Sequence, residues 1–168
     1  SLAVELGATE LRGGAYRTLR TPGGYTFCIV AHQGTSMRTG PDAALGTPMR
    51  VDQLTLDLPD DLHDADVEFW QRLTGWPLEA GSRAEFGVLA APAAMPLRLL
   101  VQRTPAGTAI GAHLDIACGR GVPMLAAAHV RLGARIEQDD LPWTTLQAPS
   151  GHRYCLTPRD PDTGRRPG

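Results

Sequence analysis

The chain has 168 residues, 16 Lys and Arg against 18 Asp and Glu, and a formal net charge of −2. This length suits one domain, or one domain with part of another, and it excludes a miniprotein held together by disulfides. The near-neutral charge, with arginines spread along the chain, argues against nucleic acid as a partner. The sequence has no run of about 18 apolar residues, so no membrane span is predicted.

The residue types restrict the chemistry further. Every basic residue is Arg, which excludes a catalytic lysine and the phosphate-binding loop that requires one. The three cysteines are scattered and odd in number, which favours free thiols in a reducing compartment. We therefore expect a cytoplasmic protein.

Two stretches that lie far apart in the chain read alike. The matching pairs are residues 4–8 with 130–134 and residues 16–29 with 143–156. Each copy reads as the end of a helix closed by glycine, followed by a strand, a Pro-x-Gly turn and a second strand. The alternation in the last strand places Cys28 and Cys155 on the face opposite the apolar residues.

The region after the first copy predicts the same order of elements twice. Residues 34–49 read as a linker rich in Gly, Ser, Thr and Pro. The elements expected beyond it are strand 51–58, helix 61–76 ending near Gly75, strands 86–89 and 97–101, strand 112–116, helix 122–132, and further strands within 135–157. Residues 51–159 therefore predict two successive β-α-β-β-β units.

The order of these elements resembles the vicinal oxygen chelate superfamily, which contains glyoxalases, extradiol dioxygenases, fosfomycin-modifying enzymes and bleomycin resistance proteins. The residues that carry the resemblance are Gln53-Leu54-Thr55-Leu56-Asp57, Phe69-Trp70, Leu73-Thr74-Gly75-Trp76, Ala112-His113-Leu114-Asp115-Ile116, Leu132-Gly133-Ala134 and the closing stretch from Ala148 to Leu156. The resemblance implies an α+β fold of paired βαβββ modules, in which curved mixed sheets form a cup with helices outside.

In the metal-using members of this superfamily, a divalent ion takes one side-chain ligand from each of four strands, typically His and Glu. Carried onto this sequence, the ligand positions fall on Gln53, His113 and Cys155, and on Leu100 or Gln102. Only His113 is an ordinary ligand, and an aliphatic side chain binds no metal. The resemblance therefore implies an incomplete metal site, which rests on His113 and Gln53.

The incomplete ligand set favours a metal-free protein that binds a small molecule in the cup, as bleomycin resistance proteins do. The expected ligand-binding residues are Gln53, Leu100, Gln102, His113, Trp143 and Cys155. The alternative is a divalent-metal-dependent lyase, isomerase or dioxygenase acting on a substrate with vicinal oxygens, since Gln53 and His113 occupy matching opening strands. A third interpretation, suggested by the truncated repeat, is a ligand-sensing or structural module attached to an N-terminal part that this sequence lacks. No catalytic residue is assigned, and a divalent metal ion is the only cofactor left open.

The repeat also predicts the domain organisation. Residues 1–33 read as the C-terminal part of a preceding βαβββ module, residues 50–160 as a complete glyoxalase-like domain, and residues 161–168 as a flexible tail. A first module without its opening strand calls for completion from elsewhere. We therefore expect either a homodimer or pairing within the chain with an N-terminal domain that precedes this sequence.

Overall fold

Residues 1–31, 40–93 and 95–167 are described by the computed structural model, which divides into two units. The first unit contains residues 1–36 and 56–112, and the second contains residues 37–55 and 113–168. The expected linker 34–49 lies partly outside the described residues. In its described part, Asp42 and Met49 form an isolated β-bridge.

The N-terminal part of the first unit is a short helix followed by three strands. The elements are α1 (Leu2–Glu5), β1 (Thr9–Arg12), β2 (Arg17–Arg20) and β3 (Thr26–Ile29). The strands form an antiparallel sheet in the order β1-β2-β3. Its apolar side buries Leu19 in a cluster with Ala3 and Phe69, and the partly buried Phe27 packs against this cluster, because alternate residues of a strand point to opposite faces.

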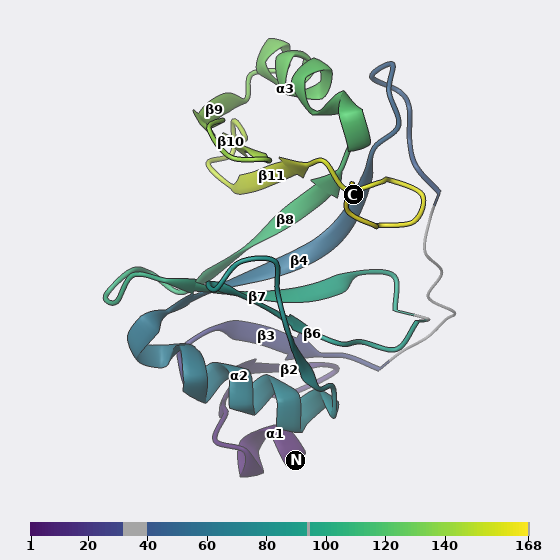
Figure 1. Cartoon of the computed structure of the whole chain (residues 1–168). Coiled ribbons are helices and arrows are strands. Elements are labelled where there is room, and N and C mark those ends of the chain that lie inside the picture. Colours follow the sequence, from purple (N-terminus) through teal and green to yellow (C-terminus); the bar gives the residue numbers. More distant parts are fainter. Residues whose placement is uncertain (32–39, 94, 168) are drawn as a thin grey trace. The chain divides into compact units, whose positions relative to one another are not determined.

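The rest of the first unit is one helix packed on a small sheet (Figure 1). Its elements are α2 (Asp60–Thr74), β5 (Leu78–Ala80), β6 (Phe86–Leu89), β7 (Arg98–Thr104) and the end of β4 (Arg50–Pro59), with strand order β5-β6-β7-β4. Acidic side chains in the first turn suit the helix dipole, and Gly75 ends α2 with a left-handed φ of 73°. Val67 packs with Leu89 and Val101, so α2 covers the sheet.

The second unit repeats the β-α-β-β-β order. Its elements are the first part of β4, then β8 (Gly111–Ala117), η1 (Gly119–Gly121), α3 (Val122–Arg131), β9 (Arg135–Gln138), β10 (Thr144–Gln147) and β11 (Arg153–Thr157). The strand order is β4-β8-β11-β10-β9, in which β11 runs parallel to β8 and antiparallel to β10. Figure 1 shows α3 covering one face of this sheet, where Leu125 packs against Leu146 and Leu156.

The sequence predicted this architecture closely. The α+β fold with two successive βαβββ modules is confirmed, and strand 86–89 has the predicted bounds. The predicted end of helix 61–76 near Gly75 is confirmed, because Gly75 is the C-cap of α2. The sequence missed β5, whose three residues are all exposed and show no alternation between buried and exposed positions.

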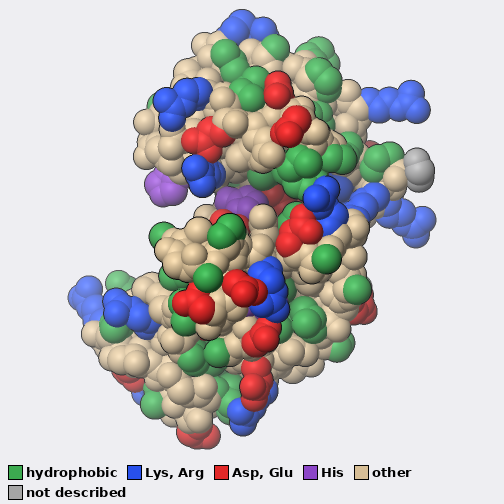
Figure 2. All heavy atoms as spheres, turned by 60° about the vertical axis from the view of Figure 1, so that its left-hand side comes forward, with side chains coloured by type: hydrophobic (Ala, Val, Ile, Leu, Met, Phe, Trp, Pro, Cys, Tyr) green, Lys and Arg blue, Asp and Glu red, His purple; other side chains and the backbone are tan. Residues whose placement is uncertain are grey.

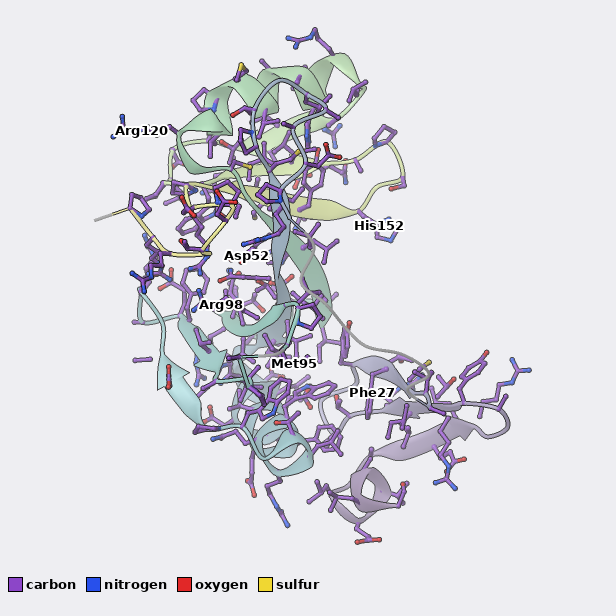
Figure 3. The ribbon with its side chains drawn as sticks, turned by 90° about the vertical axis from the view of Figure 1, so that its right-hand side faces the viewer. Phe27, Asp52, Met95, Arg98, Arg120 and His152 are labelled. Atoms are coloured by element: carbon purple, nitrogen blue, oxygen red, sulfur yellow. The ribbon has the colours of Figure 1, made fainter. Side chains whose placement is uncertain are left out.

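The C-terminal segment folds back on β4. Arg159 is buried and its Nε donates to Asp52 Oδ2 at 2.7 Å, while Arg50 donates to the carbonyl of Asp162. Figure 3 shows Asp52 beside this closing loop. The segment expected to be a flexible tail therefore begins with a hydrogen-bonded loop, in which the Gly164 N–H donates to the Asp160 carbonyl.

Charges are mixed over the visible surface. On the face drawn in Figure 2, acidic and basic side chains are interspersed. In the first unit, Arg103 contacts Asp60 and Asp64 on α2 at 2.5 and 2.7 Å. Among the described residues, no helix is both long enough and apolar enough to cross a membrane.

Candidate functional site

A polar cluster lies on the face of the second unit's sheet that points away from α3. The alternation of β8 and β11 explains its position, because Ile116 and Leu156 belong to the core beneath α3. The residues next to them in sequence, Asp115 and Cys155, therefore point to the face of the sheet opposite α3. There, His113 and Asp115 of β8 meet Cys155 of β11.

Asp115 is the centre of this cluster. Its Oδ2 accepts hydrogen bonds from Gln53 Nε2 at 2.6 Å and from Thr55 Oγ1 at 2.8 Å. Its Oδ1 lies 3.4 Å from His113 Nε2. The carboxyl group is buried, and a buried charge of this kind persists only where polar groups surround it. Gln53 and Thr55, the two donors on β4, provide these polar groups.

The strand β4 delivers both donors because its side chains alternate. Leu56 and Leu58 point into the core of the first unit, whereas Gln53 and Thr55 lie on the other face of the strand. Both are buried polar side chains. Such side chains are normally hydrogen-bonded, and here Asp115 accepts from both of them.

Cys155 reaches Asp115 through the parallel pairing of β8 and β11. The two residues are directly paired in the register of these strands. The Sγ atom of Cys155 also lies 3.5 Å from Thr145 Oγ1, on the antiparallel neighbour β10. Cys155 and Asp115 are buried, while the His113 side chain keeps 13% of its surface exposed. His113 is thus the member of the cluster that solvent reaches most easily.

The donor set of this cluster fits a divalent metal ion. One ligand atom from each of His113, Asp115 and Cys155 lies within 4.8 Å of the others. A metal–ligand bond is about 2.0–2.3 Å for imidazole, carboxylate and thiolate ligands, so two ligand atoms at the 4.8 Å limit have to move slightly closer to share one ion. The oxygen of Asp115 that faces Gln53 and Thr55 has hydrogen-bond donors, as ligating carboxylates usually do.

The structure brings together only some of the residues that the sequence predicted. Gln53, His113 and Cys155 lie in the cluster, and Gln53 contacts Asp115 through its amide nitrogen. Trp143 is partly buried directly before β10. Leu100 and Gln102 belong to β7 in the first unit. The cluster described here is formed by the second unit alone.

Sequence reasoning missed two residues of the cluster, Asp115 and Thr55. The signal was present, because Asp115 stands two residues after His113 and Thr55 two residues after Gln53. In a strand, residues two apart share a face. Applying this rule on both sides of the expected ligands would have found them.

The other buried thiol of the second unit plays no part in this site. Burial raises the pKa of Cys118 to about 12, so this side chain stays a thiol at neutral pH. It packs in the core beneath α3 with Leu125 and Leu146. A protonated thiol in an apolar core is a poor metal ligand, and Cys118 is not part of the group formed by His113, Asp115 and Cys155.

Comparison with solved structures places the fold among dioxygenases and related enzymes. A mutant of 4-hydroxymandelate synthase from Streptomyces coelicolor matches 99% of this chain and 68% of its own, with TM-score 0.52 and 14% identity. The 2,3-dioxygenase LapB from Pseudomonas sp. KL28 matches 92% of this chain and 65% of its own, with TM-score 0.54 and 13% identity. BphC, a halotolerant catechol dioxygenase, matches 92% of this chain and 60% of its own, with TM-score 0.50 and 12% identity.

These matches show that the chain shares its fold with the three structures. Residues 53–157 match the model of the glyoxalase-like domain family, and the chain belongs to that family. No curated protein matches the sequence. The family and the fold are therefore established, while the reaction has to be argued from the cluster itself.

Proposed function

We propose that this glyoxalase-like protein binds a divalent metal ion on His113, Asp115 and Cys155 and uses it to hold a small molecule with two vicinal oxygens. The observation that carries the proposal is the approach of these three ligand atoms to within 4.8 Å of one another. Three protein ligands leave coordination positions for other groups, which is typical of metal sites that act on a substrate.

The residue types favour a borderline metal ion such as Zn²⁺ or Fe²⁺. Imidazole and thiolate ligands suit these ions, whereas Mg²⁺ and Ca²⁺ prefer sites built of oxygen atoms alone. An ion at this position would polarise a bound carbonyl or stabilise an anion that forms on a vicinal oxygen. The ion would thereby supply the electrophile of a lyase, isomerase or dioxygenase reaction.

The chain's own residues would orient the ligands. Gln53 and Thr55 hold one oxygen of Asp115, which directs its other oxygen toward His113. Thr145 lies within hydrogen-bond distance of the Cys155 sulfur. Fixed ligands of this kind lose little conformational freedom when an ion binds, so the side chains of β4 and β10 prepare the site.

A metal-free binding protein is the second candidate, and one observation favours it. Asp115 already accepts two hydrogen bonds and lies next to His113, so protein groups alone can satisfy its carboxylate. In that case the cluster would bind a polar ligand through His113, as sequence reasoning favoured. Binding of a drug, as in bleomycin resistance proteins, would be one form of this second candidate function.

Metal binding distinguishes the two candidates. Protein stripped with a chelator is titrated with Zn²⁺, and with Fe²⁺ under anaerobic conditions, and the metal bound after dialysis is measured by mass spectrometry. The metal proposal expects one ion per chain in the native protein and a loss of at least about 100-fold in affinity in His113→Ala, since one of three ligands is removed.

His152→Ala provides the matched control, because His152 is exposed and projects away from the sheet (Figure 3). This variant should bind the ion as the native protein does. If the native protein binds no ion, the metal proposal is wrong. A thermal-shift screen of planar secondary metabolites, with the same two variants, then tests the binding protein.

The neighbouring structures suggest the first compounds to try. LapB is described as a 2,3-dioxygenase and BphC as a catechol dioxygenase, so catechols come first, followed by vicinal diols and thiohemiacetals. Each is added to the metal-loaded protein and followed by oxygen uptake and by ultraviolet absorbance. Turnover of a catechol with oxygen uptake would support a dioxygenase, and turnover without it would support a lyase or isomerase.

A further inference from the structure

A row of polar side chains crosses the second unit's sheet beside the cluster around Asp115. The parallel register of β8 and β11 pairs Cys155 with Asp115. Two residues earlier in each strand, the same register places Arg153 next to His113. Residues two apart in a strand share a face, so the Arg153 side chain lies on the face that carries the cluster.

The row continues across β10 and β9. Gln147 of β10 pairs with Arg153, and Arg135 of β9 pairs with Gln147. The Arg135 Nη2 donates to Gln147 Oε1 at 2.6 Å. Glu137 of β9 reaches back to β11, where its Oε2 lies 2.7 Å from Arg153 Nε. Side chains of four neighbouring strands thus form one continuous polar row that begins at His113.

This row carries an excess of positive charge. Arg135 and Arg153 are cations, and among the described residues Glu137 is the only carboxylate that forms an ion pair with either of them. A divalent ion held by the Asp115 carboxylate and the Cys155 thiolate would add no net charge, because these ligands bind a metal in their deprotonated forms. One positive charge therefore remains next to the proposed metal site.

We propose that Arg153 binds a carboxylate of the substrate while the two vicinal oxygens of the same molecule lie at the cluster. This inference rests on the proposed function and narrows its substrate to an acidic compound with vicinal oxygens. A guanidinium group matches the geometry of a carboxylate with two parallel hydrogen bonds. Glu137 restrains the Nε end of the Arg153 side chain, and its 69% exposure leaves the group accessible to a ligand.

The geometry of the strands indicates the size of the substrate. Two residues of a strand cover roughly 6.6 Å, which is the spacing between the row of Arg153 and the row of Cys155. A molecule that bridges the two rows carries its acidic group a few bonds away from its vicinal oxygens. Protocatechuate has this shape, with two neighbouring hydroxyl groups and a carboxylate on opposite sides of one ring. Its amide has the same shape without the charge.

The acid and its amide test the proposal by binding alone. Isothermal titration calorimetry measures the affinity of each compound for the zinc-loaded native protein and for zinc-loaded Arg153→Gln. We expect the native protein to bind the acid about ten times more tightly than the amide, because the hydrogen bonds to a carboxylate are charge-assisted. Arg153→Gln should abolish this preference, and Arg153→Lys should keep part of it. The preference should also weaken as the salt concentration rises.

Arg131→Gln is the matched control. Arg131 is exposed like Arg153 but lies at the end of α3, on the other face of the sheet. The control removes the same charge from the protein and should leave the preference for the acid unchanged. Equal affinities of the native protein for the two compounds would overturn the proposal, as would a preference that Arg153→Gln leaves intact.

A failure of the proposed function gives a different result. Native protein that binds no zinc contradicts the metal site, and the two compounds are then compared on the metal-free protein. A preference for the acid that depends on Arg153 would still support the carboxylate site. Binding without this preference, or no binding of either compound, would overturn it.

Discussion

Two buried aspartates, one in each unit, show what separates a structural acid from a candidate site. Asp66 on α2 is 0% exposed, and Asp115 on β8 is 4% exposed. Asp66 accepts from Thr21 Oγ1 at 2.9 Å and from the Gly23 N–H at 2.7 Å. A Cβ at position 23 would lie 2.7 Å from this carboxyl group, so the turn needs glycine there.

The difference lies in the groups around the second carboxylate oxygen. Asp66 ties the turn between β2 and β3 to α2, and both of its contacts are hydrogen-bond donors. Asp115 has two donors on one oxygen, and the candidate ligand atoms of His113 and Cys155 lie beside it. Among the described residues this is the only such group of three. Burial alone therefore does not define a site, whereas burial beside further ligating atoms does.

Replacing Asp115 should have the largest effect. Asp115→Ala leaves the Gln53 amide and the Thr55 hydroxyl buried without their acceptor, at a cost of about 2–5 kcal/mol in the free energy of unfolding. It also removes one of the three proposed metal ligands. Urea unfolding and zinc titration measure the two losses, with Asp139→Ala on an exposed loop as the control. Unchanged zinc affinity in Asp115→Ala would make Asp115 as structural as Asp66.

Replacing Asp66 should affect stability alone. Asp66→Ala removes the acceptor of two donors and should cost about 1–3 kcal/mol, with zinc affinity unchanged. Thr21→Val removes one of the two donors and should cost about 1 kcal/mol. Urea unfolding followed by tryptophan fluorescence suits the test, because Trp70 packs beside this region. A loss of zinc binding in Asp66→Ala would contradict the separation of the two roles.

The pH dependence of stability should carry the signature of Asp66. Burial raises the pKa of Asp66 above its ordinary value of 3.8, so the folded state keeps this proton at pH values where the unfolded state has lost it. The contribution of Asp66 to stability is therefore largest below pH 3.8 and declines as the pH rises through the raised pKa. Asp66→Asn carries no titrating group. Urea unfolding across this pH range measures the free energy of unfolding of the native protein and of Asp66→Asn. The native value minus the variant value should fall as the pH rises.

The second unit should show a smaller effect of opposite sign. Burial lowers the pKa of His129 below 6.5, and its Nδ1 lies 2.9 Å from the Tyr154 hydroxyl. The unfolded state then takes up the proton first, so stability is lost as the pH falls through 6.5 toward the lowered pKa. His129→Gln should remove this slope at a cost below about 1 kcal/mol. Equal slopes in the native protein and His129→Gln would contradict the prediction.

The fold could be predicted from the sequence because the spacing of apolar residues and the glycines that end helices and form turns depend on local structure. The helices α2 and α3 and the strands β4, β6 and β8 all carry such a pattern. The repeat between residues 16–29 and 143–156 also matches two hairpins with the same register. The exposed β5 carries no pattern of this kind, and its pairing with β6 depends on tertiary structure.

The site was predictable only in part, because it depends on how strands pair. Family positions identified Gln53, His113 and Cys155, but they do not show that Asp115 lies opposite Cys155. That contact follows from the parallel register of β8 and β11, which joins residues about forty positions apart in sequence. No local pattern determines such a register.

The closing loop at Arg159 implies that the second unit completes its folding late during translation. In this unit β4 can complete its sheet only after β8 and β11 have been translated. The buried pair of Asp52 and Arg159 also joins residues 107 positions apart. The ribosome releases the chain from its N-terminus, so most of the first unit emerges before β11 has been translated. Until Arg159 emerges, its hydrogen bond to Asp52 cannot form. Nascent chains stalled before this arginine should thus be the species most in need of a chaperone.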